Sequence, residues 1–245
     1  GAARWGPWEL VWVRWYLTTA VAQLGPARVE KFSGEGELRP RERPVPRVEW
    51  APWGRWAAWE LSATGTAARV EVRDLSAATV RLGVHWRAPE LSLGPIELQL
   101  PSGAVHGEVQ LEMQSQRARF RLRSEADPYD LEPWLSERGR RWLSQFQWRK
   151  PPRIDAEGEF ELPAWPPNRE DWSDLLRQRL RLAGQIEIGE SAYRGFTADQ
   201  VRTHFRFEHG TWRFPDLEVQ RRDGWVRADY WVRPWDRDYH WQFQL

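Results

Sequence analysis

Apolar and polar residues alternate with a period of two over most of this chain, a pattern typical of antiparallel β-sheet. From Val105 to Met113, every second residue is apolar or glycine, and the residues between them are His106, Glu108, Gln110 and Glu112. After a reversal at Ser115-Gln116, the alternation resumes and continues to Arg123. This stretch predicts a β-hairpin with one apolar face and one face in water.

The same alternation, punctuated by Gly and Pro, predicts strands along the whole chain, near 28–39, 55–64, 67–73, 77–87, 90–100, 153–162, 179–189, 199–209, 211–220, 225–233 and 238–245. Two stretches have helical spacing instead: 128–147, and a short segment that begins at Asn168 as its N-cap. We therefore expect an all-β fold, an elongated and curled antiparallel sheet of tandem strand repeats, with one or two short helices.

The chain also repeats itself at an offset of 121 residues. Residues 96–105 align with 217–226, so that Gly103 meets Gly224, and the alternating faces coincide after this match. An offset of 122 aligns 34–38 with 156–160. A duplicated strand unit predicts four parts: a strand segment of a preceding unit (1–27), β unit 1 (28–124), a helical connector (125–150) and β unit 2 (151–245). Tandem strand units solve the problem of exposed sheet edges by continuing one another.

The overall composition argues against several classes of protein. The net charge is +1 and no basic block stands out along the chain, so nucleic acid is not an expected partner. Cysteine is absent, and the five histidines lack metal-like spacing, so we expect no metal or cofactor. No catalytic motif is recognisable, and we expect a protein that is not an enzyme. No run of 18 apolar residues occurs.

The unusual number is 19 tryptophans. Indole rings favour half-buried strand faces, where the ring packs and the N–H finds a partner. Packing within the sheet is the main interpretation. Stacking on sugars and contact with lipid remain as alternatives.

Residues 151–245 carry the strongest family resemblance, in three segments: Ala156–Trp165, Ala192–Phe205 and Gly210–Leu217. Arg222-Asp-Gly224 before a closing strand extends it, and it continues more weakly through 101–107 and 124–128. This pattern resembles the C-terminal repeating region of the AsmA-like bacterial envelope proteins. The high tryptophan content departs from the family pattern, in which Leu, Val and Phe fill such strand positions.

The resemblance implies a repeating β-groove, similar to bridge-like lipid-transfer proteins, that binds phospholipid acyl chains. It also implies a periplasmic location in the bacterial cell envelope, a role in outer membrane biogenesis or envelope integrity, and an inner-membrane anchor outside this chain. The chain begins without Met and ends in an expected strand, so we expect a fragment of a longer protein. The protein partners stay open.

The candidate groove lining is the set of apolar residues that share one face of the expected strands: Val109, Leu111, Met113, Phe120, Leu122, Phe205, Phe207, Trp212, Phe214, Trp241 and Phe243. The alternation leaves two other functions open. One is a tryptophan-rich carbohydrate-binding module, and the other is a structural β module whose apolar faces form a closed core.

Overall fold

The fold is all-β, as the alternation predicts. The computed structural model describes residues 12–41, 53–72, 75–135, 137–162, 178–233 and 238–244. Fifteen strands form one antiparallel sheet that stays open and does not close into a barrel. They are β1 (Val13–Leu24), β2 (Ala27–Pro40), β3 (Trp59–Ala67), β4 (Arg69–Val72), β5 (Leu75–Ala77), β6 (Thr79–Arg87), β7 (Glu90–Leu100), β8 (Gly103–Glu112), β9 (Arg117–Ser124), β11 (Arg153–Glu161), β12 (Arg181–Ile188), β15 (Gln200–Glu208), β16 (Thr211–Arg221), β17 (Gly224–Arg233) and β18 (Asp238–Gln244).

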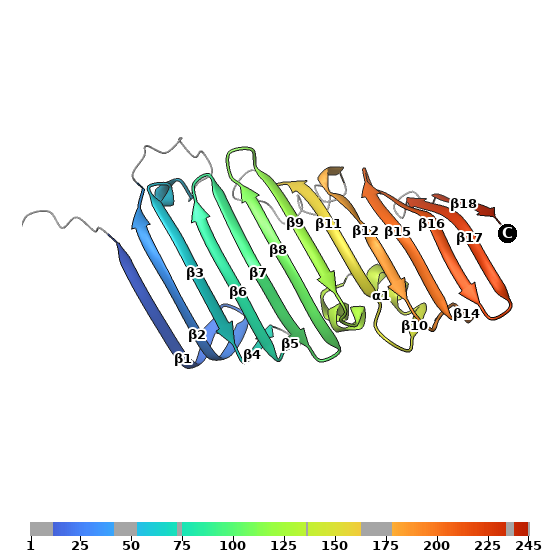
Figure 1. Ribbon diagram of the computed structural model, residues 1–245, viewed down its shortest axis with the longest axis horizontal. Helices are drawn as coiled ribbons and strands as arrows, with labels where there is room; N and C mark the ends of the chain where they lie inside the picture. The colour runs from blue at the N-terminus through green and yellow to red at the C-terminus, as the bar shows by residue number, and fades with distance from the viewer. Residues whose placement is uncertain are drawn as a thin grey trace, which may run out of the picture.

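The strands lie in space almost in the order in which they follow one another in the chain, from β1 at one edge to β18 at the other (Figure 1). β3 and β4 pair with successive parts of β2, so the two act as one strand that is broken at Ala68. A smaller sheet of three strands, β10 (Phe146–Trp148), β13 (Ser191–Tyr193) and β14 (Phe196–Ala198), lies beside the ends of the large sheet's strands. The two halves of the chain meet where β9 pairs with β11.

The strand plan recurs at the offset seen in the sequence. β6, β7 and β8 span 79–87, 90–100 and 103–112, and β15, β16 and β17 span 200–208, 211–221 and 224–233, each 121 residues later. The irregularities recur as well: the register between β7 and β8 shifts between Leu93 and Ile96, and that between β16 and β17 shifts between Phe214 and Leu217. The duplicated pattern therefore extends from the sequence to the strand bounds and to the β-bulges.

Register then determines which residues share a face. Across the joint, Gly107, Leu122, Ala156, Gly184 and Phe205 are successive cross-strand partners on β8, β9, β11, β12 and β15. Because side chains directly opposite one another point to the same side of a sheet, these five residues share one face. We call it the apolar face. Its reverse, which carries the alternate residues, is the charged face.

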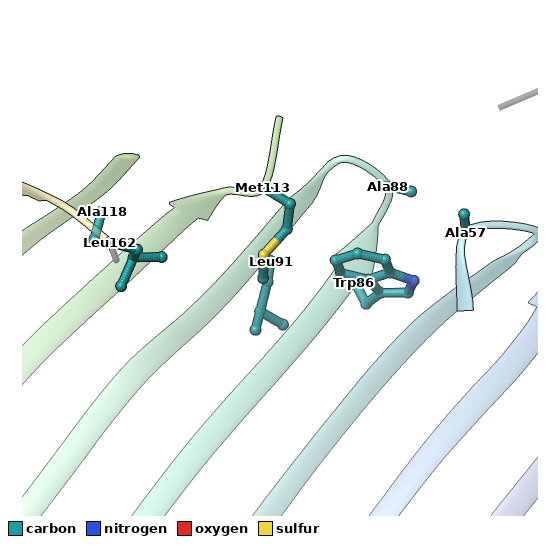
Figure 2. Packing of buried hydrophobic residues seen from close by; sticks show 7 residues of the cluster. All are labelled: Ala57, Trp86, Ala88, Leu91, Met113, Ala118 and Leu162. Carbon is teal, nitrogen blue, oxygen red and sulfur yellow. The ribbon is translucent and has the colours of Figure 1, made fainter. Parts of the chain in front are cut away.

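In the first half of the sheet the fully buried residues gather at the ends of the strands, whereas in the second half Phe205 and Ala228 are buried within β15 and β17. One cluster forms near the turns that follow β6, β8 and β11, and it contains Ala57, Trp86, Ala88, Leu91, Met113, Ala118 and Leu162 (Figure 2). The indole N–H of Trp86 donates to the backbone oxygen of Trp56, 2.8 Å away. A second cluster contains Ala77, Leu100 and Ala126, near the other ends of the strands.

Three expected elements differ from the structure or fall outside it. Residues 53–56 form a 3-10 turn, η1 (Trp53–Trp56), and the strand expected from 55 begins at Trp59. The helical stretch expected over 128–147 is a 3-10 helix, η2 (Pro128–Trp134), then α1 (Glu137–Leu143), and it ends before strand β10. The reason is that Pro133, near the C-terminal end of η2, cannot donate a helical hydrogen bond, and Phe146 pairs with Tyr193 instead of continuing a helix. The helix expected from Asn168 lies outside the described residues.

Candidate functional site

The apolar face is continuous across the sheet but unevenly covered. At the strand ends it is buried, and Met113 is 2% exposed. In the middle of the strands, Leu82 on β6 and Leu122 on β9 are 36% and 38% exposed. Among the described residues, no second sheet packs over this face, and η2 and α1 stand at the ends of the strands (Figure 1). In the first half of the sheet the face is therefore accessible between its two buried ends, and over β15 and β17 it is more covered.

Aromatic rings lie on this face above cross-strand glycines. A Cβ built on Gly158 would meet Cζ of Phe120 at 2.6 Å, and one built on Gly184 would meet Cζ of Phe205 at 2.6 Å. Trp15 covers Gly36 in the same way, with its Cζ2 2.5 Å from the ideal Cβ position. The glycines let the rings lie close against the backbone. In this part of the face the aromatic rings therefore lie close to the sheet backbone and form a flat surface, instead of projecting from it.

Aromatic contacts continue over the second half of the sheet. The ring of Trp212 lies 4.9 Å from that of Phe207 and is nearly parallel to that of Phe214, at 6.1 Å. Phe214 in turn stacks on Tyr230 at 5.6 Å, so the strip crosses β15, β16 and β17. Phe205, whose ring is 5.9 Å from that of Trp212, and Phe207 are the buried members of the strip, at 4% and 5% exposure.

The structure brings most of the candidate lining residues onto the apolar face, in three different settings. Register places eight of them together: Val109, Leu111, Phe120, Leu122, Phe205, Phe207, Trp212 and Phe214. Met113 follows β8 in the turn and belongs to the buried end cluster, and Leu122 belongs to the exposed middle. Trp241 and Phe243 pair with Tyr230 and Ala228, and their side chains lie outside the described part.

Sequence reasoning missed Leu82, Trp15 and Tyr230. Leu82 alternates with Val80, Val84 and Trp86 on its strand, so periodicity alone places it with them. The place of Trp15 over Gly36 depends on the register between β1 and β2, which no pattern within one strand reveals.

The charged face is a lattice of ion pairs. Arg121 has Glu108 on one neighbouring strand and Glu157 on the other, at 3.7 and 3.6 Å. Arg119 reaches Glu159 at 3.9 Å, and Arg181 reaches Glu159 and Glu208 at 3.5 and 3.3 Å. These pairs are exposed, and each contributes at most about 1 kcal/mol to stability. The arginine stripe from 117 to 123 is thus matched by acids on both neighbouring strands.

Two hollows, of about 520 and about 1130 Å³, lie over β8, β9, β11, β12 and β15. Both are lined by Glu108, Arg121, Glu157 and Arg206, which belong to the charged face. Neither is an enclosed apolar cavity. Any apolar ligand therefore has to lie along the open apolar face.

The titratable residues outside the apolar and charged faces form no recognisable metal site in the described part of the chain. The described part of the chain holds no group of three His, Asp or Glu residues that could bind a metal ion. The five histidines are exposed, and Nδ1 of His204 is 2.9 Å from a carboxylate oxygen of Asp216. Within the described ranges, no helix is long and apolar enough to cross a membrane.

No family model matches the chain, and neither a curated protein nor a solved structure is significantly similar to it.

Proposed function

We propose that this protein is a non-enzymatic binding module that holds lipid acyl chains along the apolar face. The observation that supports the proposal is the exposed middle of that face, between the two buried clusters at the strand ends. A contiguous exposed apolar surface on one side of a protein commonly marks a binding site. The flat surface formed by the aromatic rings above the glycines suits a flexible acyl chain that lies along it.

The energetics favour such a ligand. Burial of each methylene group removes apolar surface from water and contributes about 0.8 kcal/mol. A long acyl chain has enough methylene groups to offset the cost of becoming immobilised, whereas a sugar ring has polar groups that need partners. The apolar face offers few such partners, since its exposed members Leu82 and Leu122 are hydrocarbon.

The resemblance to the AsmA-like proteins extends the proposal. On the basis of that resemblance we propose a location in the bacterial cell envelope, on the periplasmic side, as a part of a longer chain anchored to the inner membrane. There it would support phospholipid transfer between membranes or envelope integrity. Phospholipids are the proposed ligands, and no cofactor takes part.

The test compares two variants that differ only in which face they change. Leu82→Gln with Leu122→Gln makes the exposed middle of the apolar face polar. The matched control, Arg81→Gln with Arg121→Gln, changes the preceding residue on each strand, which points to the charged face. Native mass spectrometry and lipid extraction of gently purified protein then measure the bound phospholipid.

We expect phospholipid with the unmodified protein and with the arginine control, and a loss of most of it in the leucine variant. Lipid-free protein in all three preparations, or equal lipid in all three, counts against the proposal. A shift of tryptophan fluorescence with soluble glycans, in a protein that carries no lipid, favours the carbohydrate-binding function instead.

A further inference from the structure

The helix α1 and the small sheet of β10, β13 and β14 stand beside the ends of the large sheet's strands (Figure 1), and they carry a group of aromatic residues, three of them exposed. The ring of Trp142 on α1 is 4.8 Å from that of Phe146, which is 4.8 Å from that of Tyr193. Tyr193 pairs with Phe196 across β13 and β14. We call Trp142, Phe146, Tyr193 and Phe196 the ring row. Three of its members are exposed: Trp142 at 56%, Phe196 at 52% and Tyr193 at 39%.

The ring row is surrounded by basic side chains. The guanidinium of Arg194 lies over the ring of Tyr193 at 5.4 Å, and that of Arg221 lies over Phe196 at 5.0 Å. The two arginines of the last turn of α1, Arg140 and Arg141, are exposed beside Trp142. Between 137 and 150 the chain has five basic residues and one acid, Glu137, although its net charge is only +1. This stretch is a local basic block in a chain that is otherwise nearly neutral.

Nearby acids are partly neutralised. Glu190 is paired with Arg149 at 3.0 Å, and Asp223 with Arg221 at 3.1 Å. No described carboxylate forms an ion pair with Arg140, Arg141 or Arg194. Arg140, Arg141 and Arg194 therefore leave positive charge beside the ring row. The acids Asp127, Asp130 and Glu132 belong to η2, which also contacts α1.

The combination of rings and arginines fits one kind of partner. Trp, Tyr and Phe settle at the boundary between the headgroups and the acyl chains of a bilayer, and basic residues beside them bind anionic headgroups. We propose that the ring row and its arginines dock this protein on an anionic phospholipid bilayer. The rings enter the headgroup layer, and Arg140, Arg141 and Arg194 contact the lipid phosphates. This docking goes beyond acyl-chain binding on the apolar face, because it needs no lipid to leave the membrane.

Co-sedimentation with vesicles tests the proposal. The protein is mixed with vesicles of phosphatidylcholine alone and with vesicles that also contain phosphatidylglycerol, at low and at high salt. We expect binding to the anionic vesicles that weakens with salt, and little binding to the neutral ones. Arg140→Glu with Arg141→Glu should lower the binding by about tenfold or more, since each cation near an anionic surface contributes substantially.

Two matched controls separate the contribution of the ring row and its arginines from general effects of changing a charge or removing a tryptophan. Arg206→Glu with Arg213→Glu makes the same charge change on the charged face, where the two residues are cross-strand partners. Trp56→Ala removes a tryptophan that is 52% exposed on η1, far from α1, for comparison with Trp142→Ala. Both controls should bind anionic vesicles as the unmodified protein does, and Trp142→Ala should bind several-fold less.

Equal binding to neutral and anionic vesicles overturns the proposal, as does unchanged binding of the α1 variants. Loss of soluble-glycan binding in Trp142→Ala, without any vesicle binding, assigns the ring row to sugars instead. The acyl-chain proposal fails separately. The α1 variants should keep their co-purified phospholipid, and the Leu82→Gln with Leu122→Gln variant should still sediment with vesicles.

Discussion

The ring of Phe120 on β9 lies against Gly158 on β11, so close that a Cβ on Gly158 would stand 2.6 Å from Cζ of the ring. The two residues are direct cross-strand partners at the joint between the two halves of the sheet. Trp15 and Gly36 have the same relationship at the joint between β1 and β2. A ring over a glycine thus occurs at two corresponding joints of one sheet.

Gly158→Ala should destabilise the joint. The added methyl group would meet the Phe120 ring and also the backbone oxygen of Arg181 at 2.7 Å, so the side chain cannot relieve the clash by rotating away. We expect a loss of about 1–3 kcal/mol in the free energy of unfolding, measured by urea denaturation. Gly189→Ala is the control, because no heavy atom lies within 4 Å of its Cβ position. Equal stability of the two variants would show that the ring does not need the glycine.

Met113 should contribute mainly to the stability of the fold, and Leu122 mainly to the binding of phospholipid. Met113 is 2% exposed in the end cluster, and its truncation to Ala should cost about 2–5 kcal/mol through lost packing and a residual cavity. Leu122 is 38% exposed, and Leu122→Ala should cost about 1 kcal/mol or less while lowering the amount of bound phospholipid. Urea denaturation and lipid extraction of the same samples measure both effects. A large stability loss for Leu122→Ala would indicate that the middle of the face is covered.

Glu112 should make the hairpin between β8 and β9 sensitive to acid. Burial raises the pKa of Glu112, but hydrogen bonds from Ser115 and Gln114 and the charge of Arg117 outweigh it, so the pKa lies below its usual value. Its carboxylate accepts the amides of Gln114 and Ser115 at 2.9 and 2.8 Å. A depressed pKa means that this stabilisation is present above the ordinary carboxylate pKa and is lost as the pH falls through the folded value.

Glu112→Gln should therefore cost about 1 kcal/mol at neutral pH, and the difference from the unmodified protein should vanish in acid. Thermal denaturation over a pH series measures this. Glu97→Gln, which alters an exposed pair with Arg81 at 3.9 Å, serves as the comparison for the loss of a carboxylate and should cost less at neutral pH. A constant difference at every pH would contradict the assignment.

Equivalent positions in the two halves should respond alike to proline. The backbone amide of Ala78 donates to the oxygen of Gln99 at 2.7 Å, and that of Asp199, 121 residues later, donates to the oxygen of Gln220 at 2.9 Å. Proline removes the donor, so Ala78→Pro and Asp199→Pro should each cost about 1–3 kcal/mol. Glycine at the same positions keeps the amide and is the control. A large loss at one position alone would show that the two hydrogen bonds are not equivalent.

Most of the strands could be predicted from the sequence, because alternation is a local property. The strand expected over 90–100 is β7 to the residue, and the reversal at Ser115-Gln116 is a turn in which Gln116 has a φ of 55°. The pattern failed where aromatic residues occur outside the large sheet. Phe146 was assigned to a helix by its spacing from Trp142 and Leu143, yet it lies in β10, held there by pairing with Tyr193.

For the candidate site, the sequence could predict which side of the sheet each residue lies on, but not which residues are exposed there. Alternation placed Phe120, Leu122 and Phe205 on one side, but it could not show that Met113 would be buried while Leu122 stays exposed. That difference depends on how turns distant in the sequence, such as the one at Ala57, fold over the strand ends. The ring row was invisible for the same reason, since β10 and β13 meet only in the folded chain.

The order of the strands has a consequence for how this protein comes apart. Because most strands of the large sheet are paired with their neighbours in the chain, most contacts close short loops, and the longest bridges are the pairings of β2 with β4 and of β9 with β11. Stability in such an array is close to a sum of strand-to-strand terms, as in repeat proteins. Unfolding can therefore begin at β18 or β1 and proceed inward one strand at a time. Unfolding of this protein should therefore be less cooperative than that of a single globule. The central strands around β8 and β9 should be the last to separate.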